Sequence, residues 1–437
     1  LGPNVTAWNV CLHYMVYELL LWLHPTTLEY MPALATHWQI SPDKKTFRFR
    51  INPNARFSDG SPVTSADVIA TWKLVTDKTL QDPAQTIIFS NFQTPVAESK
   101  YIVSVTAKDV NWQNLMNFGY SLLIMPASGL NGVNGAAYIR DFNYKMLPGS
   151  GPYMVKEQDV NKGNSVRITK RNDYWAEKDR RNVGRNNFAS INQLVVRDEN
   201  LEFERVKRGD LDLLVVMRAQ QWVQELNYPN VKRGLNLKRK IFNAEPQGIQ
   251  GIAINTRREP YNDVRVRKAL RHLFNREVMI QKLAFNEYLP LDSLFPFSLY
   301  ENPNNEKIKY DPQLALKLLA EAGFKDRDSA GRLTRNGKPL ALDLVYGTQG
   351  FDRYFTVYQE DLRKVGITLN IRYVTWETLI KLIDDHAFEL ANVAYTGEPF
   401  PVVRMNYHSS LADQKNNNNI TGFKNKRADE IMDTYEK

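Results

Sequence analysis

The chain of 437 residues is poor in the residue types that build cross-links and metal centres. Its single cysteine, Cys11, excludes an intramolecular disulfide and a metal cluster held by cysteines alone. The six histidines are scattered, without the His-x-x-His or His-Glu-x-x-His spacing that would place two metal ligands on one helix face. We therefore expect neither a bound metal ion nor a cofactor.

Long apolar runs are also missing. The longest runs, such as Leu19 to Leu23, are far shorter than the roughly 20 residues that a helix needs to cross a bilayer. We expect no membrane-spanning helix in this chain.

The sequence lacks the frames that mark common catalytic sites. Residues 149–151 do not have the Gly-x-Ser-x-Gly frame of a nucleophile elbow, and residues 336–339 lack the upstream glycine and the following hydroxyl residue of a phosphate loop. Asp384 and Asp385 are adjacent, so their carboxylates do not face each other across a substrate. We expect a protein that is not an enzyme.

Positive charge is concentrated in one region. The net charge is +9, and residues 162–240 hold 18 Lys or Arg against 10 Asp or Glu, a local excess of +8. A protein that binds nucleic acid or another polyanion would show such asymmetry. However, the basic residues of 167–171 and 237–241 alternate with apolar ones, as on solvated strand faces. This pattern favours a solvated or docking surface, and we expect no nucleic-acid partner.

Local patterns predict regular structure in the first half. Residues 46–51 alternate apolar and basic side chains, which is typical of a half-buried strand. Residues 58–62 have the composition of a tight turn. Thr64 lies three residues before Asp67, the spacing of a capping box, and predicts that a helix follows.

The second half predicts strands that alternate with helices. Asp263 is expected to cap one helix and Asp311 another, the second with Leu314, Leu318 and Leu319 facing inward. The other expected elements, a helix at 356–365 and strands at 250–255, 340–346 and 367–374, complete the alternation. This alternation indicates an α/β sheet with crossover connections.

Several sequence motifs resemble those of the large solute-binding proteins that serve peptide-type ABC importers, the family 5 extracellular solute-binding proteins. Six such motifs occur in the same order as in the family. They lie at residues 33–72, 149–153, 172–175, 209–212, 254–270 and 310–324.

The resemblance implies a fold and a domain plan. The fold is α/β, of the type II periplasmic-binding-protein class, with two lobes around a ligand cleft plus an extra domain. We map residues 1–17 and 148–245 to a discontinuous first lobe, 18–147 to the extra domain and 246–437 to the second lobe. Compared with the family pattern, both chain ends look truncated.

The resemblance also implies a function. The protein is expected to be the substrate-binding component of an ABC importer, a monomer that captures a peptide or similar solute by closure and presents it to the transmembrane permease subunits. Its expected location is the periplasm, or the extracellular face of the cell membrane as a lipoprotein. The same receptor role for a non-peptide solute, such as an oligosaccharide, an opine or a modified peptide, stays open.

The resemblance also implies candidate ligand-binding residues, from their positions relative to the family's motifs. In peptide-binding relatives, an acidic residue shortly after a Trp-containing strand pairs with the peptide ammonium. Residues 392–401, at the corresponding place, contain no Asp and no Trp, and Glu398 is the nearby carboxylate. Glu398 either substitutes for that acid or is a plain loop residue. Further candidates are Trp8, Asn9, Cys11, Asn255, Tyr395 and Thr396.

Overall fold

The structure of the protein is a computed structural model that describes residues 1–2, 7–142, 144–242, 247–398, 400–401 and 403–435, without the side chains of residues 7–11 and 83–84. It contains two compact units, Leu1–Glu202 with Asp433–Lys437 and Phe203–Met432. The three-part plan with boundaries at 17, 147 and 245 remains a prediction.

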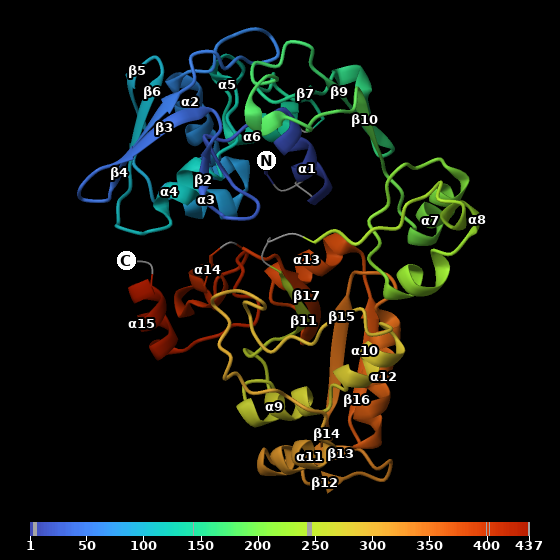
Figure 1. Ribbon diagram of the computed structural model, residues 1–437. Helices are drawn as coiled ribbons and strands as arrows, with labels where there is room; N and C mark the ends of the chain where they lie inside the picture. Colours follow the sequence, from blue (N-terminus) through green and yellow to red (C-terminus); the bar gives the residue numbers. More distant parts are fainter. Residues whose placement is uncertain (3–6, 143, 243–246, 399, 402, 436–437) are drawn as a thin grey trace. The chain divides into compact units, whose positions relative to one another are not determined.

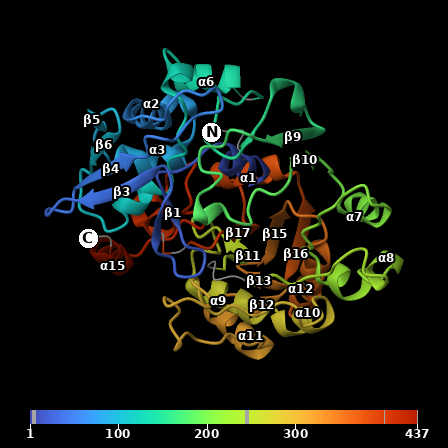
Figure 2. The same ribbon diagram turned by 45° about the horizontal axis from the view of Figure 1, so that its top comes forward.

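The first unit is built around an antiparallel sheet in the order β3-β4-β6-β5. In its strand β4 (Thr46–Ile51) the side chains of Phe47, Phe49 and Ile51 are buried and the two arginines are exposed, as the alternation predicts. The helix α2 (Ser65–Val75) contributes Val68 to the same core, and Figure 2 shows it beside these strands. Burying one aliphatic or aromatic side chain contributes about 1.5–3 kcal/mol to stability.

The predicted turn and helix start both form. Gly60 has a φ of +84°, which an L residue rarely adopts, and the Asp59 carboxylate accepts the Ser61 N–H at 2.9 Å. At the start of α2 the Asp67 carboxylate accepts the backbone N–H of Thr64 at 2.6 Å. Its other oxygen accepts the N–H of Ala127 at 2.7 Å, so Asp67 caps one helix and anchors the beginning of another.

A second sheet of the first unit has the order β10-β9-β7, with β8 also paired to β9. In β9 (Ser165–Lys170) the Ile168 side chain is buried and Arg167 is exposed, as expected for a solvated strand face. The expectation is wrong for Arg171, which is buried because its guanidinium donates to the carbonyls of Phe57, Gly149 and Gly151. Residues 237–241, for which the same pattern was expected, form no strand.

The remaining elements of the first unit are short. The strands are β1 (Leu21–Leu23), β2 (Tyr30–Pro32), β3 (Ala35–Ile40), β5 (Val96–Ser99), β6 (Ile102–Thr106), β7 (Tyr153–Met154), β8 (Val160–Asn161) and β10 (Ser190–Leu194). The helices are α1 (Ala7–Val16), α3 (Pro83–Ser90), α4 (Asn114–Gly119), α5 (Ala127–Leu130) and α6 (Gly135–Phe142).

The second unit has a mixed four-stranded sheet in the order β11-β17-β15-β16. Three of the strands run parallel, and the fourth, β11, is antiparallel to β17. Two crossover helices connect the parallel strands, and Figure 1 shows α12 along β16. The predicted α/β sheet with crossovers is therefore confirmed. The bounds are β11 (Ile249–Ile254), β15 (Ala341–Tyr346), α12 (Asp352–Lys364), β16 (Thr368–Tyr373), α13 (Trp376–Asp384) and β17 (Leu390–Tyr395).

Two capped helices of this unit, α9 (Val264–His272) and α11 (Pro312–Glu321), begin where the sequence predicts. The carboxylates of Asp263 and Asp311 accept backbone N–H groups at 2.8 and 2.9 Å. The expected inward position of Leu314 is wrong, because this side chain is 37% exposed. The buried stripe of α11 passes through Ala315 and Leu319, four residues apart, which turns position 314 outward.

Helix α12 begins at Asp352, four residues before the predicted start. Its buried face includes Phe355, Tyr358 and Leu362, which follow helical spacing. The first turn is therefore held by the burial of Phe355, which precedes the predicted start of the helix at residue 356.

Two of the remaining helices, α7 and α15, include residues of both units. The helices are α7 (Glu199–Arg208), α8 (Pro229–Lys232), α10 (Arg276–Lys282), α14 (Val403–Tyr407) and α15 (Lys426–Tyr435). A small antiparallel sheet contains β12 (Asp326–Arg327), β13 (Leu333–Arg335) and β14 (Lys338–Pro339). Within the described part of the chain, none of the helices is long and apolar enough to span a membrane.

Candidate functional site

The topology of the second unit marks one end of its sheet as a place for a ligand. From β15 the chain crosses to β16 on one side and then returns to β17 on the other, so the strand order reverses at β15. In open α/β sheets, ligands bind beyond the carboxyl ends of the strands at such a reversal. Strand β17 reaches its carboxyl end at Tyr395.

A pocket includes this end of β17 and has a cavity volume of about 50 Å³. Four segments form it: the start of β11, the loop between α10 and α11, the residues that follow β17, and α14. The lining residues are Gln247, Ile249, Leu294, Phe295, Pro296, Ser298, Tyr300, Tyr395, Thr396, Gly397, Glu398, Phe400, Pro401, Asn406 and Tyr407.

Gly248 allows the beginning of β11 to pass close to the residues that follow β17. A Cβ atom at this position would lie 2.3 Å from the carbonyl oxygen of Tyr395 and 3.1 Å from the backbone nitrogen of Gly397. Contacts this short would force the two segments apart. A glycine is therefore needed here to keep two walls of the pocket together.

Glu398 provides the one carboxylate among the described residues of the pocket lining. Glu398 stays exposed at the mouth of the pocket, and partial loss of water around its carboxyl group raises its pKa above the ordinary value. Its side chain makes no hydrogen bond or ion pair with any residue that the structure describes. An unpaired carboxylate in a pocket that also lacks Lys, Arg and His among its described lining residues is suited to bind a cation.

Aromatic rings supply much of the remaining surface of the pocket. The rings of Tyr395 and Tyr407 are tilted against each other with centroids 6.4 Å apart, and Tyr407 meets Phe423 edge to face at 6.2 Å. The Tyr395 hydroxyl donates to the carbonyl of Asn418 at 2.9 Å, which fixes the ring. Burial raises the pKa of both Tyr395 and Tyr407, so both phenols stay neutral. The site can therefore hold a cation beside rigid apolar surfaces.

The structure brings Tyr395, Thr396 and Glu398 together at this pocket, as their closeness in the sequence suggests. It separates Asn255 from them. In the antiparallel pair, Ile249 lies opposite Tyr395, whereas Ile254 lies opposite Leu390 at the other end of β17. Asn255 thus follows the far end of β11.

The side chain of Asn255 is occupied by structural hydrogen bonds. Its amide nitrogen donates to the carbonyls of His386 and Phe388 at 3.2 and 3.0 Å, and its oxygen accepts from the Arg257 guanidinium at 3.1 Å. The residue is 1% exposed. Asn255 therefore lies away from this pocket with its polar atoms hydrogen-bonded inside the fold, and its part in ligand binding stays a prediction.

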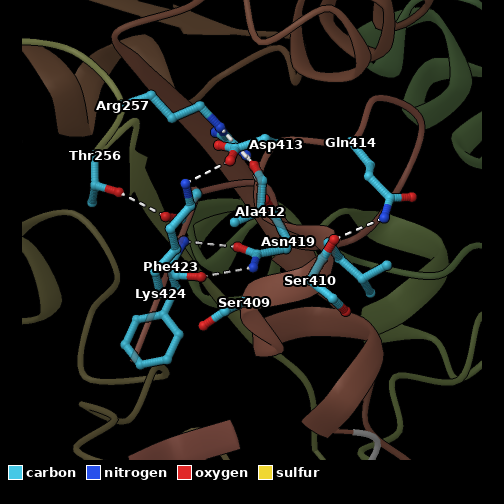
Figure 3. A network of polar contacts seen from close by, with 12 residues as sticks. Thr256, Arg257, Ser409, Ser410, Ala412, Asp413, Gln414, Asn419, Phe423 and Lys424 are labelled. Carbon is cyan, nitrogen blue, oxygen red and sulfur yellow. Dashed lines mark hydrogen bonds and ion pairs between the residues drawn. The ribbon is translucent and has the colours of Figure 1, made fainter. Parts of the chain in front are cut away.

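Arg257 and Asn419 form the centre of a polar network at that far end, shown in Figure 3. The Arg257 guanidinium donates to the carbonyls of Ala412, Asn419 and Ile420, the last two at 2.9 Å. The Asn419 amide donates to the carbonyl of Phe423 and accepts its N–H, both at 2.9 Å. The network joins the loop after α14 to the end of β11. Because the Arg257 guanidinium and the Asn419 amide donate to backbone carbonyls, these groups stabilise the fold.

Three predicted site residues, Trp8, Asn9 and Cys11, belong to α1. Their side chains lie outside the described residues, so their part in binding stays a prediction. Among the described residues, His, Cys, Asp and Glu do not gather in a group of three or more that could hold a metal ion.

Sequence reasoning missed two walls of the pocket. The loop at 294–300 and the α14 residues Asn406 and Tyr407 come from distant parts of the sequence. The available sequence signal was the group of apolar and aromatic residues in this segment, among them Leu294 and Phe297.

Comparison with known proteins identifies the family. The family model "Bacterial extracellular solute-binding proteins, family 5 Middle" matches residues 29–418. The probable peptide-binding protein YejA of Agrobacterium fabrum is 26% identical over 430 residues, which cover 89% of this chain and 69% of that protein. The oligopeptide-binding protein AppA of Bacillus subtilis is 25% identical over 393 residues, or 88% of this chain and 68% of AppA.

Solved structures confirm the fold. AppA in complex with a nonapeptide has a TM-score of 0.84 at 23% identity, covering 100% of this chain and 84% of AppA. An oligopeptide-binding protein of Thermotoga maritima with mannohexaose bound has a TM-score of 0.78 at 19% identity, covering 96% of this chain and 78% of that one. The periplasmic-binding-protein type II fold is thus confirmed. The chain belongs to the bacterial extracellular solute-binding proteins of family 5.

Proposed function

We propose that the protein is the solute receptor of an ABC importer and that its solute is a peptide whose free ammonium binds Glu398. The observation that carries the proposal is the unpaired carboxylate of Glu398 in a pocket lined by aromatic rings. The names of the relatives YejA and AppA support a peptide as the solute. A charge-assisted hydrogen bond to the ammonium would give the Glu398 carboxylate the partner that it lacks among the described residues.

The proposed receptor role also specifies the oligomeric state, the partner, the absence of catalysis and the location of the protein. The protein works as a monomer, delivers its solute to transmembrane permease subunits and performs no catalysis. It acts in the periplasm or, as a lipoprotein, at the outer face of the cell membrane. The family supports this, since it consists of extracellular solute-binding proteins.

A binding measurement tests the peptide assignment. Short peptides with a free ammonium are titrated into the wild-type protein, and the same peptides are titrated after N-acetylation. We expect acetylation to lower the affinity about 10- to 100-fold, because a hydrogen bond to a charged group contributes about 1.5–3 kcal/mol. Native mass spectrometry of the purified protein, which would reveal retained peptides as a ladder of masses, is the complementary experiment.

Two variants make the test specific to the pocket. Glu398→Gln should lower the affinity for free peptides to that for acetylated ones. Glu306→Gln, at an exposed loop glutamate that does not line the pocket, should leave affinity unchanged. If Glu398→Gln binds free peptides as tightly as the wild type, the assignment of the ammonium to Glu398 is wrong.

A non-peptide solute is the second candidate, favoured by the rings of the pocket and by the mannohexaose in the Thermotoga maritima neighbour. Sugar rings stack on aromatic side chains without needing a carboxylate partner. An oligosaccharide that binds the wild type and Glu398→Gln equally, together with no binding of peptides, would establish this alternative.

A further inference from the structure

The loop between α10 and α11 exposes apolar side chains where it lines the pocket. Leu294 is 50% exposed and Tyr300 is 42% exposed, and both belong to the lining together with Phe295. Large apolar surfaces that remain in contact with water often mark a binding surface. Nothing among the described residues of the second unit covers these side chains.

The pocket combines this apolar wall with a single negative charge. Glu398 is unpaired among the described residues, and the described lining contains no cationic side chain that could bind a carboxylate or phosphate. A solute group with a negative charge would be repelled by Glu398 and would find no counter-ion. A positive group with apolar carbon attached to it matches both features.

The size of the cavity limits how much of a solute can enter. A single water needs about 10–15 Å³ measured in this way. The cavity of about 50 Å³ therefore holds only a few groups of that size. That space suits an ammonium and the side chain beside it, while the rest of a longer solute stays outside.

We propose that this pocket selects peptides by their first residue and prefers a large apolar side chain there, such as leucine or phenylalanine. The ammonium pairs with Glu398, and the apolar side chain covers Leu294, Phe295 and Tyr300. This inference rests on the proposed peptide-binding function and adds a substrate class to it.

Tetrapeptides that differ only in their first residue test the preference. The series has leucine, phenylalanine, alanine or aspartate followed by three alanines, and affinities are measured by isothermal titration calorimetry. We expect leucine and phenylalanine to bind about 10- to 100-fold more tightly than alanine, from the apolar surface removed from water. Aspartate should bind more weakly than alanine.

Two variants test whether the apolar wall of the pocket causes the preference for an apolar first residue. Leu294→Ser combined with Tyr300→Ser should lower the affinity for the leucine peptide to that for the alanine peptide, so that the discrimination between the two is lost. Leu299→Ser is the matched control, since this leucine lies in the same loop, is fully exposed and does not line the pocket. It should keep the full preference.

The outcomes distinguish the two proposals. If free peptides bind and Glu398→Gln weakens them, but leucine and alanine bind equally or aspartate binds best, the preference is wrong and the peptide-binding function stands. The same conclusion follows if the double variant keeps the preference. If no peptide of the series binds, both proposals are wrong. Circular dichroism and the thermal midpoint of each variant establish that it is folded.

Discussion

At the scale of single residues, the pKa of Glu398 makes solute binding dependent on pH. Loss of contact with water raises this pKa above the ordinary 4.5. An ammonium needs the charged carboxylate, so peptide affinity should be full near neutral pH and should fall as the pH drops through the raised pKa. Calorimetric titrations in steps from about pH 7 to about pH 4 measure this loss. The Glu398→Gln variant should show weak affinity with a flat profile over the same range.

The same pKa predicts the opposite sign for stability. A carboxyl whose pKa is higher in the folded than in the unfolded state favours folding when protonated, and this contribution is lost as the pH rises through the raised pKa. Glu398→Gln should therefore be at least as stable as the wild type at neutral pH. A profile of affinity that stays unchanged down to about pH 4 would contradict the role of the Glu398 carboxylate.

Arg257 illustrates a residue whose hydrogen bonds serve the fold. Its guanidinium satisfies the carbonyls of Ala412, Asn419 and Ile420 and the side chain of Asn255. Arg257→Ala leaves these acceptors without their donor, and we expect a loss of about 2–4 kcal/mol in the free energy of unfolding. Arg257→Lys should restore only part of it, because an ammonium lacks the planar fork.

Urea denaturation measures both Arg257 variants. Arg258→Ala provides a neighbouring control, since Arg258 is exposed and its side chain makes no hydrogen bond to a described residue. This control should change stability by less than about 0.5 kcal/mol. An Arg257→Ala loss as small as that of the control would mean that water replaces the guanidinium at these carbonyls.

At the scale of elements, local signals account for what the sequence predicted well. The capping distance from Thr64 to Asp67 and the alternation of residues 46–51 act within a few residues, and both elements formed as expected. The start of α12 was missed because the burial of Phe355 depends on tertiary packing, including its ring contact with Tyr346 of β15. The place of Asn255 was missed for a similar reason: only the antiparallel register of β11 and β17 sends it to the far end of the sheet.

The candidate site shows the same limit. Tyr395, Thr396 and Glu398 are neighbours in sequence and were found together, whereas the loop with Leu294 and Tyr300 reaches the pocket only through the tertiary fold. No spacing within one segment connects residue 294 with residue 398. Sequence patterns therefore identified one wall of the pocket and could not identify the facing ones.

One extended segment of the second unit predicts a tendency to aggregate. Residues 213–217 are five consecutive apolar residues, and Leu213, Val215 and Met217 are 81%, 64% and 74% exposed. No backbone hydrogen bond joins residues 213–216 to another described residue. An exposed apolar run with high strand propensity, without proline or charge, is a site for intermolecular pairing.

Val215→Lys should reduce this aggregation several-fold and change the free energy of unfolding by less than about 0.5 kcal/mol, because a charge within the run opposes pairing between chains. Light scattering during incubation at raised temperature measures it. Val183→Lys, at an exposed valine outside any apolar run, is the matched control and should aggregate like the wild type. Equal scattering by both variants would exclude residues 213–217 as the aggregating segment.

At the scale of the whole molecule, the positive charge raises the question of a polyanion partner. The net charge is +9, and +8 of it lies in residues 162–240, whereas the described lining of the pocket carries a single negative charge. Binding that neutralises phosphates depends steeply on salt, because counterions are released. A peptide held by one ammonium–carboxylate pair and by apolar contacts depends on salt only weakly.

Titrations at increasing salt distinguish the two kinds of partner. Peptide affinity should change by less than about threefold between about 50 and about 200 mM salt. Binding of a short DNA duplex through six to ten phosphates would fall about 10³- to 10⁵-fold over the same range. We expect any DNA binding to be weak, lost at the higher salt and unaffected by Glu398→Gln. DNA that stays bound at about 200 mM salt and competes with peptide would overturn the receptor assignment, since it would place the polyanion in the pocket itself.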